Sequence, residues 1–389
     1  MTRRPPIYLD NAASTPCDPR VVEAMTPFFT TSFGNPACRH GWGTEAAEAV
    51  ESARADAANL IGAAPGEIIW TAGATESNNL AIKGVARAAP GGHCHIVTSA
   101  IEHKAVLQPC TRMQAEGFEV TFVAPEHDGV ITAEQVAAAL RDDTLLVSII
   151  AVNNEIGTLS EVREIGALCR DRGVLFHTDA TQMVGLLPVD VRRDTIDLLS
   201  FSGHKISGPK GVGALYVRDR DPPIAIQPVI EGGGHERGLR AGTLNVPGIV
   251  GLGRACELCA VNLGDEGPRL LALRRRLEDG LRQRLGDVAI NGDPVRRAPH
   301  ITNLCLPSPA GTAIVEHLRE VACSSGSAIG AAGRTSSHVL AAIGVPDELA
   351  MTSLRLSLGR TTTAEQIDLA IDHLVETVEN LRRTASRLT

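Results

Sequence analysis

Strand-like and helical segments alternate along this chain from about residue 21 to residue 250, and this alternation restricts the possible folds more than any other feature. The strand-like segments are short and aliphatic, and stretches with the spacing of amphipathic helices join them; the clearest are strands over 68–71, 95–99, 145–152 and 174–178 and helices over 43–60 and 161–172. This pattern predicts a mostly parallel sheet with helices on both faces. Ligands of such sheets bind at the carboxyl ends of the strands.

The pattern changes near residue 264. A long, charged amphipathic helix over 266–285 is followed by short strands and by a last helix over 364–386. We therefore predict an α/β fold with a large domain over residues 15–260 and a smaller α+β domain made of residues 1–14 and 261–389. No stretch rich in glycine, serine or proline separates the two halves, so we expect the domains to share a long helix and to pack closely.

The composition predicts a soluble, cytoplasmic protein. Hydrophobic residues make up 43% and charged residues 21% of the 389, and the net charge of −8 gives no basic surface for nucleic acid. The longest apolar run, 145–152, is far shorter than the roughly 20 residues of a membrane span, and the N-terminus lacks the apolar segment of a secretion signal. Nine irregularly spaced cysteines argue against a disulfide framework. Cys256 and Cys259 have no second pair nearby, so no metal site is expected.

Three motifs at predicted strand ends carry candidate chemistry. The turn 71–79 (TAGATESNN) opens a helix, where backbone N–H groups and the Thr75 hydroxyl either bind a phosphate or only cap the helix. Asp179 ends a strand and either pairs with a protonated pyridine nitrogen or caps a turn. Lys205, one of four lysines, follows another strand and is either a desolvated nucleophilic amine or a solvated surface charge. Together and in this order, the three motifs predict a pyridoxal phosphate site.

Matches to one enzyme family cover nearly the whole chain, from YLDNAAST at residue 8 onward. The matching stretches include GNPACRHGWG, TAGATESNN, EHKAV, VNNEIGT, HTDATQ, SFSGHKISGPKGVGAL, GGGHERGLRAGTLN and LRLSLGR. With these stretches the sequence resembles the cysteine desulfurases, fold-type I pyridoxal phosphate enzymes of the class V aminotransferase group. The resemblance implies that L-cysteine yields L-alanine and an enzyme persulfide, whose sulfur passes to an acceptor protein. We expect DNA phosphorothioation as the pathway, ahead of iron–sulfur assembly or tRNA thiolation.

The resemblance also implies roles for residues around the cofactor ring. Lys205 would form the Schiff base with pyridoxal phosphate, and Asp179 would pair with the pyridine nitrogen. Gln182 would bond the phenolic oxygen of the ring. His103 would stack on the ring face and transfer protons.

Further residues would hold the phosphate and the substrate. Residues of two subunits would contact the phosphate and its surroundings, which implies a homodimer with shared sites. One subunit would contribute Ala74, Thr75, Asn154, Ser202 and His204, and the other would contribute Thr243. Arg355 would hold the substrate carboxylate through a bidentate contact, helped by Asn11 and Asn154.

The chain departs from the family at the sulfur-accepting cysteine, because Ile329 follows SSGSA where the family has cysteine. If the segment is a strand, Ser327 shares a face with Ile329 roughly 6.6 Å away, and we expect it at the nucleophile position as an oxygen-for-sulfur replacement. A hydroxyl is too weak to form a persulfide, so the chain as given would then be inactive in that step. Cys323, roughly 13 Å back on the same face, is one alternative. Another lyase or aminotransferase, or a catalytically silent scaffold, is the other.

Overall fold

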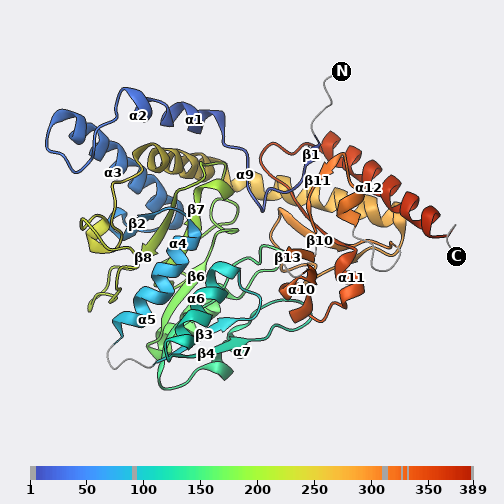
Figure 1. Ribbon diagram of the computed structural model, residues 1–389, viewed down its shortest axis with the longest axis horizontal. Helices are drawn as coiled ribbons and strands as arrows, with labels where there is room; N and C mark the ends of the chain where they lie inside the picture. Colours follow the sequence, from blue (N-terminus) through green and yellow to red (C-terminus); the bar gives the residue numbers. More distant parts are fainter. Residues whose placement is uncertain (1–5, 90–93, 309–313, 326, 331–332, 387–389) are drawn as a thin grey trace.

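A computed structural model describes residues 6–89, 94–308, 314–325, 327–330 and 333–386, with the backbone alone for 327–330 and 333–336 (Figure 1). Its large part is built on a seven-stranded sheet in the order β2-β8-β7-β6-β5-β3-β4. The strands are β2 (Ile68–Thr71), β3 (His95–Ser99), β4 (Glu119–Val123), β5 (Thr144–Ser148), β6 (Leu175–Asp179), β7 (Leu198–Ser202) and β8 (Gly213–Val217). β8 runs antiparallel to β2 and β7, and the other neighbours are parallel. The predicted mostly parallel α/β fold is confirmed.

Helices cover both faces of this sheet (Figure 1). Along β2, Ile68 and Trp70 pack in the core under α3 and the first half of α9, whereas Ile69 packs in the opposite core with α6. Both faces of the strand are therefore buried, as its unbroken apolar run requires. The helices are α1 (Pro19–Met25), α2 (Pro27–Thr30), α3 (Gly41–Ile61), α4 (Ala74–Asn79), α5 (Val85–Ala88), α6 (Lys104–Ala115), α7 (Ala133–Ala139), α8 (Val162–Arg172), α9 (Val246–Leu285), α10 (His338–Ala342), α11 (Asp347–Met351) and α12 (Ala364–Ala385).

A second core lies in the smaller part of the molecule. It packs a four-stranded sheet, in the order β12-β15-β10-β9, against α12 and the second half of α9. These strands are β9 (Ala289–Ile290), β10 (Ile301–Cys305), β12 (Ser324–Ser325) and β15 (Ser353–Ser357). The N-terminal strand β1 (Ile7–Tyr8) pairs with β11 (Val321–Ala322), and Leu9 joins this core. The first described strand thus packs in the same part of the molecule as the last described helix.

Helix α9 runs through both cores. Its first half contributes Leu252 and Cys256 to the large core, and its second half contributes Leu273 and Leu281 to the small core. Within the described chain, α9 alone is long and apolar enough to cross a membrane by length and composition, but 56% of the qualifying stretch is buried inside the protein. This burial identifies α9 as a core helix.

The segment around Ser327 is divided among three strand partners. β11 pairs with β1, β12 pairs with β15, and β13 (Ser327–Gly330) pairs with β14 (Gly333–Ser336). Ser327 and Ile329 therefore share one strand, and alternation places them on the same face. Cys323 lies between β11 and β12, so strand alternation does not place it on the face that Ser327 and Ile329 share.

Candidate active site

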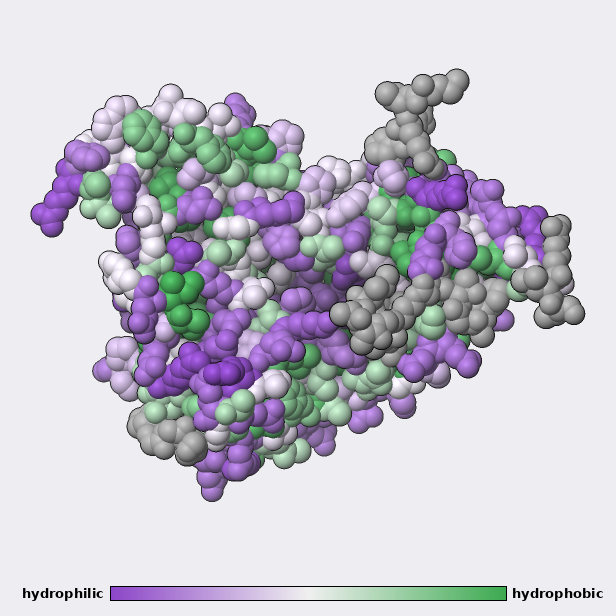
Figure 2. Space-filling model, in the orientation of Figure 1, coloured by the Kyte–Doolittle hydropathy of each residue, from purple (hydrophilic) through white to green (hydrophobic). Residues whose placement is uncertain are grey.

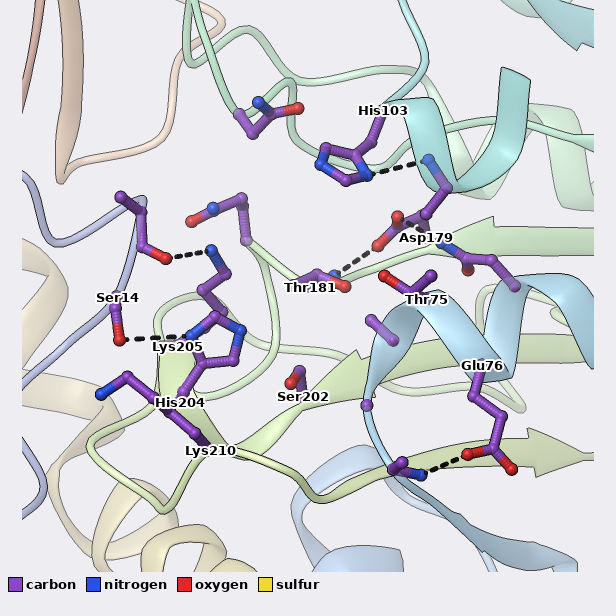
Figure 3. A pocket seen from close by; sticks show the side chains of 18 of the residues that line it. Ser14, Thr75, Glu76, His103, Asp179, Thr181, Ser202, His204, Lys205 and Lys210 are labelled. Carbon is purple, nitrogen blue, oxygen red and sulfur yellow. Dashed lines mark hydrogen bonds between the residues drawn. The ribbon is translucent and has the colours of Figure 1, made fainter. Parts of the chain in front are cut away.

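One cavity of about 950 Å³ gathers most of the predicted site residues, at the carboxyl ends of β6 and β7 (Figure 3). Asp179 is the last residue of β6, and Ser202 is the last residue of β7. The location is the one expected for a ligand of a parallel sheet. The predicted residues that line the cavity are Ala74, Thr75, His103, Asn154, Asp179, Gln182, Ser202, His204, Lys205 and Arg355.

Lys205 closes a single turn of 3-10 helix after β7. Its Nζ donates hydrogen bonds to the carbonyl oxygens of Ala12 at 2.6 Å and Ala13 at 2.8 Å. Desolvation of the ammonium, followed by the positive charge of Arg355, lowers the pKa of Lys205 to about 8. A useful fraction of the amine is therefore unprotonated near neutral pH, as a Schiff-base lysine requires.

Asp179 is buried and held in a fixed orientation. Its Oδ2 accepts a hydrogen bond from Asn78 Nδ2 at 2.7 Å, and its Oδ1 accepts one from the backbone N–H of Thr181 at 3.0 Å. A carboxylate in this setting presents a fixed negative charge to the cavity, where a protonated ring nitrogen would neutralise it. The sequence did not single out Asn78.

His103 caps the N-terminus of α6 and lies on the cavity side of Asp179 (Figure 3). Its Nδ1 accepts a hydrogen bond from the backbone N–H of Ala105 at 3.0 Å, so the neutral ring carries its proton on Nε2. Desolvation lowers the pKa of His103 and keeps the ring neutral. The preceding Glu102 is fully buried, accepts hydrogen bonds from Ser99 Oγ and the Ile150 N–H, and has a pKa that burial raises to about 8.

The opposite end of the cavity suits an anion. Gly73 precedes α4 with φ of 151°, a backbone conformation that favours glycine, and lies against Ser202. The helical stretch that begins at Ala74 continues through a π-helical turn (Leu80–Gly84) to Ala88, and its first N–H groups face this space. Burial, with the charges of Lys205 and Lys210, lowers the pKa of His204 to about 4, so its ring is neutral.

Arg355 lies at the third side of the cavity, where the small part of the molecule meets the large one. Its Nη1 donates to the Asn154 carbonyl oxygen at 3.0 Å, and its Nη2 lies 2.7 Å from Asp10 Oδ1 and 2.8 Å from Ser324 Oγ. Ser324 Oγ also donates to Asp10 Oδ1 at 2.8 Å. The buried Nε of Arg355 has no hydrogen-bond partner among the described residues.

Two of the predicted site residues do not line this cavity, and the side chain of a third lies outside the described residues. Asn11 is buried and donates from Nδ2 to the Ser357 carbonyl oxygen at 2.9 Å, so it does not line this cavity. Thr243 is exposed on the loop before α9 and does not line the cavity of its own subunit. Ser327 belongs to β13, where the side chains lie outside the described residues. Its role stays a prediction.

The segment Asp10–Ser14, of which the sequence predicted only Asn11 as a site residue, contacts four site residues. Ala12 accepts hydrogen bonds from Lys205 Nζ and, at 2.8 Å, from Gln182 Nε2. Ser14 Oγ lies 3.3 Å from His204 Nδ1, and Asp10 pairs with Arg355. The contacts of Ala12 use its backbone carbonyl group, which leaves no side-chain signature in the motif YLDNAAST.

This donor set fits pyridoxal phosphate. The cavity offers an amine of lowered pKa, an oriented carboxylate and a helix start that favours a phosphate, all in one space. Thr181 Oγ1 is buried beside Asp179 and has no partner among the described residues. A polar ligand atom at this side of the cavity would satisfy it.

The comparison with known families decides the assignment. The aminotransferase class-V family model matches residues 7–369. The chain belongs to the class V aminotransferases. This class V chain is 51% identical over 380 residues to "Cysteine desulfurase IscS" of Klebsiella pneumoniae subsp. pneumoniae, with 97% of the chain and 94% of that protein covered.

Solved structures agree with this assignment of the class V chain. A "NifS-like protein" superposes with a TM-score of 0.89 at 36% identity, covering 97% of this chain and all of the other. "SspA in complex with cysteine" superposes with a TM-score of 0.81 at 40% identity, covering 90% of this chain and 98% of the other. DndA from Streptomyces lividans superposes with a TM-score of 0.75 at 40% identity, covering 90% of this chain and 99% of the other. This class V chain is a pyridoxal phosphate-dependent enzyme of the cysteine desulfurase group, as predicted.

Proposed function

We propose that this enzyme takes the sulfur of L-cysteine at the cavity described above, releases L-alanine and passes the sulfur to an acceptor protein. The observation that carries the proposal is that Lys205 and Arg355 line the same cavity. An amine of lowered pKa for the amino acid chemistry therefore faces a guanidinium for the amino acid carboxylate. The complex of the similar protein SspA with cysteine supports this choice of substrate.

Each residue of the site would have a separate chemical role. Bound pyridoxal phosphate supplies an electron sink conjugated to the substrate. Lys205 would hold the cofactor, and Asp179 would keep its ring nitrogen protonated by pairing with it. The neutral imidazole of His103 would accept and return protons on the cavity side. Arg355 would orient the carboxylate, with the Asn154 backbone fixing its guanidinium.

The direct test is alanine release. Purified holoenzyme supplied with L-cysteine and a reducing thiol should form alanine, and Lys205→Ala should form none while its circular dichroism stays that of the wild type. Equal alanine release from the two proteins would remove Lys205 from the proposed role.

We propose sulfur modification of DNA as the pathway, which the 40% identity to DndA supports. The IscS relatives, at 51% identity, favour supply of sulfur for iron–sulfur assembly as a second candidate. Recovery of the tagged protein from its own cells, followed by mass spectrometry of the captured proteins, separates the two. Capture of iron–sulfur scaffold proteins alone would reject the DNA pathway.

We also propose that the enzyme works in the cytoplasm as a homodimer with shared sites. In support, an exposed aromatic patch formed by Phe29, Phe33 and Trp42 lies on the segment around α2 and the start of α3, in a chain with only 3% aromatic residues. The Phe33 and Trp42 rings stack with centroids 5.2 Å apart. Figure 2 shows apolar side chains gathered over α1 and α2, and a partner subunit would remove such a surface from water.

A further inference from the structure

Sulfur transfer from cysteine needs a thiolate close to the substrate, and the positions of all the chain's thiols are known. All nine cysteines fall in the described part of the chain, and none of them lines the cavity. Five are buried: Cys110, Cys169, Cys256, Cys259 and Cys305. Cys17, Cys94 and Cys323 are half-buried, and Cys38 is exposed. No thiol of this subunit therefore faces the predicted substrate position.

The cysteine with the strongest claim from the sequence is unsuited to attack. Cys323 packs at the edge of the small core, and burial, followed by the charge of Asp10, raises its thiol pKa to about 12. Cys259 lies behind the lysine turn, with its Sγ 3.9 Å from the Ile206 carbonyl oxygen, and burial raises its pKa as well. Neither group forms an appreciable amount of thiolate at neutral pH.

The part of the chain after Cys323 offers no replacement. No cysteine occurs after residue 323, so the hairpin of β13 and β14 carries hydroxyl groups but no thiol. A serine hydroxyl is not ionised at neutral pH and does not attack a thiol sulfur. The machinery for binding and activating L-cysteine is nevertheless assembled around Lys205, Asp179 and Arg355.

The cavity is also open to an approaching molecule. Lys210 and Ile230 both line it and are both exposed, with 44% of Ile230 accessible to solvent. Lys210 forms no ion pair within the described part of the chain. An unpaired ammonium at this opening favours the thiolate form of an incoming thiol over the thiol form.

We propose that the thiol that attacks the substrate sulfur belongs to a second molecule, namely a cysteine residue of the acceptor protein that enters the cavity beside Lys210. This inference rests on the proposed desulfurase function. The incoming thiolate forms a bond to the substrate Sγ as the Cβ–Sγ bond breaks, and the electron pair of the broken bond stays on Cβ. Cβ takes a proton and becomes the methyl group of alanine. The acceptor leaves with the sulfur as a persulfide, and no added oxidant or reductant is consumed.

A single-turnover experiment tests the source of the thiol. Holoenzyme in excess is mixed with sulfur-labelled L-cysteine in the absence of any other thiol, so that no second cysteine molecule is free. Alanine is quantified, and the intact mass of the chain is measured. We expect the cofactor absorbance to respond to L-cysteine, with almost no alanine and no gain of a sulfur atom on the chain.

The thiol is then added in two forms. A short peptide with one cysteine should restore alanine release in a saturable manner and should carry the labelled sulfur as a persulfide, whereas its serine counterpart should restore nothing. Lys210→Gln should slow the reaction of the peptide at least severalfold. Lys104→Gln, also at an exposed lysine, is the matched control.

Two results would overturn the proposal. One alanine per site without added thiol, together with sulfur on the chain that Cys323→Ala or Cys38→Ala abolishes, would return the nucleophile to the enzyme. Restoration by N-acetylcysteine but not by the peptide would assign the role to a small-molecule thiol. Absence of alanine with every thiol tested would instead reject the desulfurase function itself.

Discussion

The environment of single residues sets the chemistry of the cavity. Lys205 combines desolvation with a nearby guanidinium, and both lower the pKa of its amine to about 8. Only the neutral amine forms a Schiff base, so the rate of cofactor uptake by the apoprotein should rise with pH and level off above about pH 8. Stopped-flow absorbance of added pyridoxal phosphate measures this rate. Lys205→Arg keeps the charge and should show no covalent band at any pH; a pH-independent rate in the wild type would contradict the assignment.

Asp10 offsets the charge of Arg355 at the edge of the cavity. Asp10→Asn keeps an oxygen acceptor for Arg355 Nη2 and Ser324 Oγ but removes the negative charge. The guanidinium should then attract the substrate carboxylate more strongly, so the dissociation constant of L-cysteine should fall severalfold. Titration of the cofactor absorbance with L-cysteine measures it. Asp10→Ala, which also removes the acceptor, should weaken binding, and equal affinities for all three proteins would show that Asp10 has no such role.

At the scale of elements, the single helical turn Glu236–Gly238 is held by a buried ion pair. Glu236 accepts hydrogen bonds from both terminal nitrogens of Arg54 at 2.9 Å and from the Trp70 N–H at 2.7 Å. Glu236 and Arg237 adopt left-handed backbone conformations, with φ of 48° and 59°, which these contacts must stabilise.

Glu236→Ala leaves the Arg54 charge buried without its partner. The free energy of unfolding should fall by about 3–5 kcal/mol, as measured by urea denaturation. Glu257→Ala, at an exposed glutamate on α9, is the control and should change stability by less than about 0.5 kcal/mol. A loss of similar size in both variants would contradict a special role for the buried pair.

The sequence predicted strands that are short, buried and bounded by turns. It misplaced the end of a strand where buried residues continue beyond the residues that pair. β2 and β3 begin and end where the sequence analysis placed them, but β5 ends at Ser148 rather than near residue 152. Residues 149–152 are buried without belonging to the sheet, and an apolar run reports only burial. In the same way, Lys205 and Asp179 were predicted from their motifs, whereas the carbonyl contacts of Ala12 have no side-chain signature.

At the scale of the whole molecule, a shared site can be tested by subunit complementation. Lys205→Ala and Thr243→Ala homodimers should each be nearly inactive. A mixed dimer would contain one intact site, with Lys205 from one subunit and Thr243 from the other. After unfolding and refolding together, the mixture should regain about a quarter of wild-type alanine release, because about half of the dimers are mixed. No recovery, with mixed dimers confirmed by native mass spectrometry, would show that Thr243 does not serve the neighbouring site.

Buried histidines should make the whole fold sensitive to acid. Burial lowers the pKa of His177 to about 4 and that of His300 to about 3, so both are neutral in the folded protein. Unfolded histidine binds a proton below about pH 6.5. The unfolded state therefore binds more protons between pH 6.5 and pH 4, and these groups lower the free energy of unfolding there by up to about 1.4 kcal/mol per pH unit each.

One other buried group opposes this trend. Glu102, whose pKa is raised to about 8, lowers stability as pH rises from about 4.5 to 8. Stability should therefore be greatest near pH 6.5. Urea denaturation at a series of pH values checks this, and a profile without a fall below pH 6.5 would contradict the neutral state of the two histidines.

The 40-residue helix α9 and the N-terminal Leu9 place a limit on genetic dissection of this enzyme. The small core takes Leu9 from before the large part and Leu273 and Leu281 from after it, so no single continuous fragment provides it. A truncated chain that ends within α9 would leave the large part with an exposed apolar helix end. Anyone who needs an isolated half for binding studies will have to join distant gene segments, and separating the halves would also remove Arg355 from the cavity that contains Lys205.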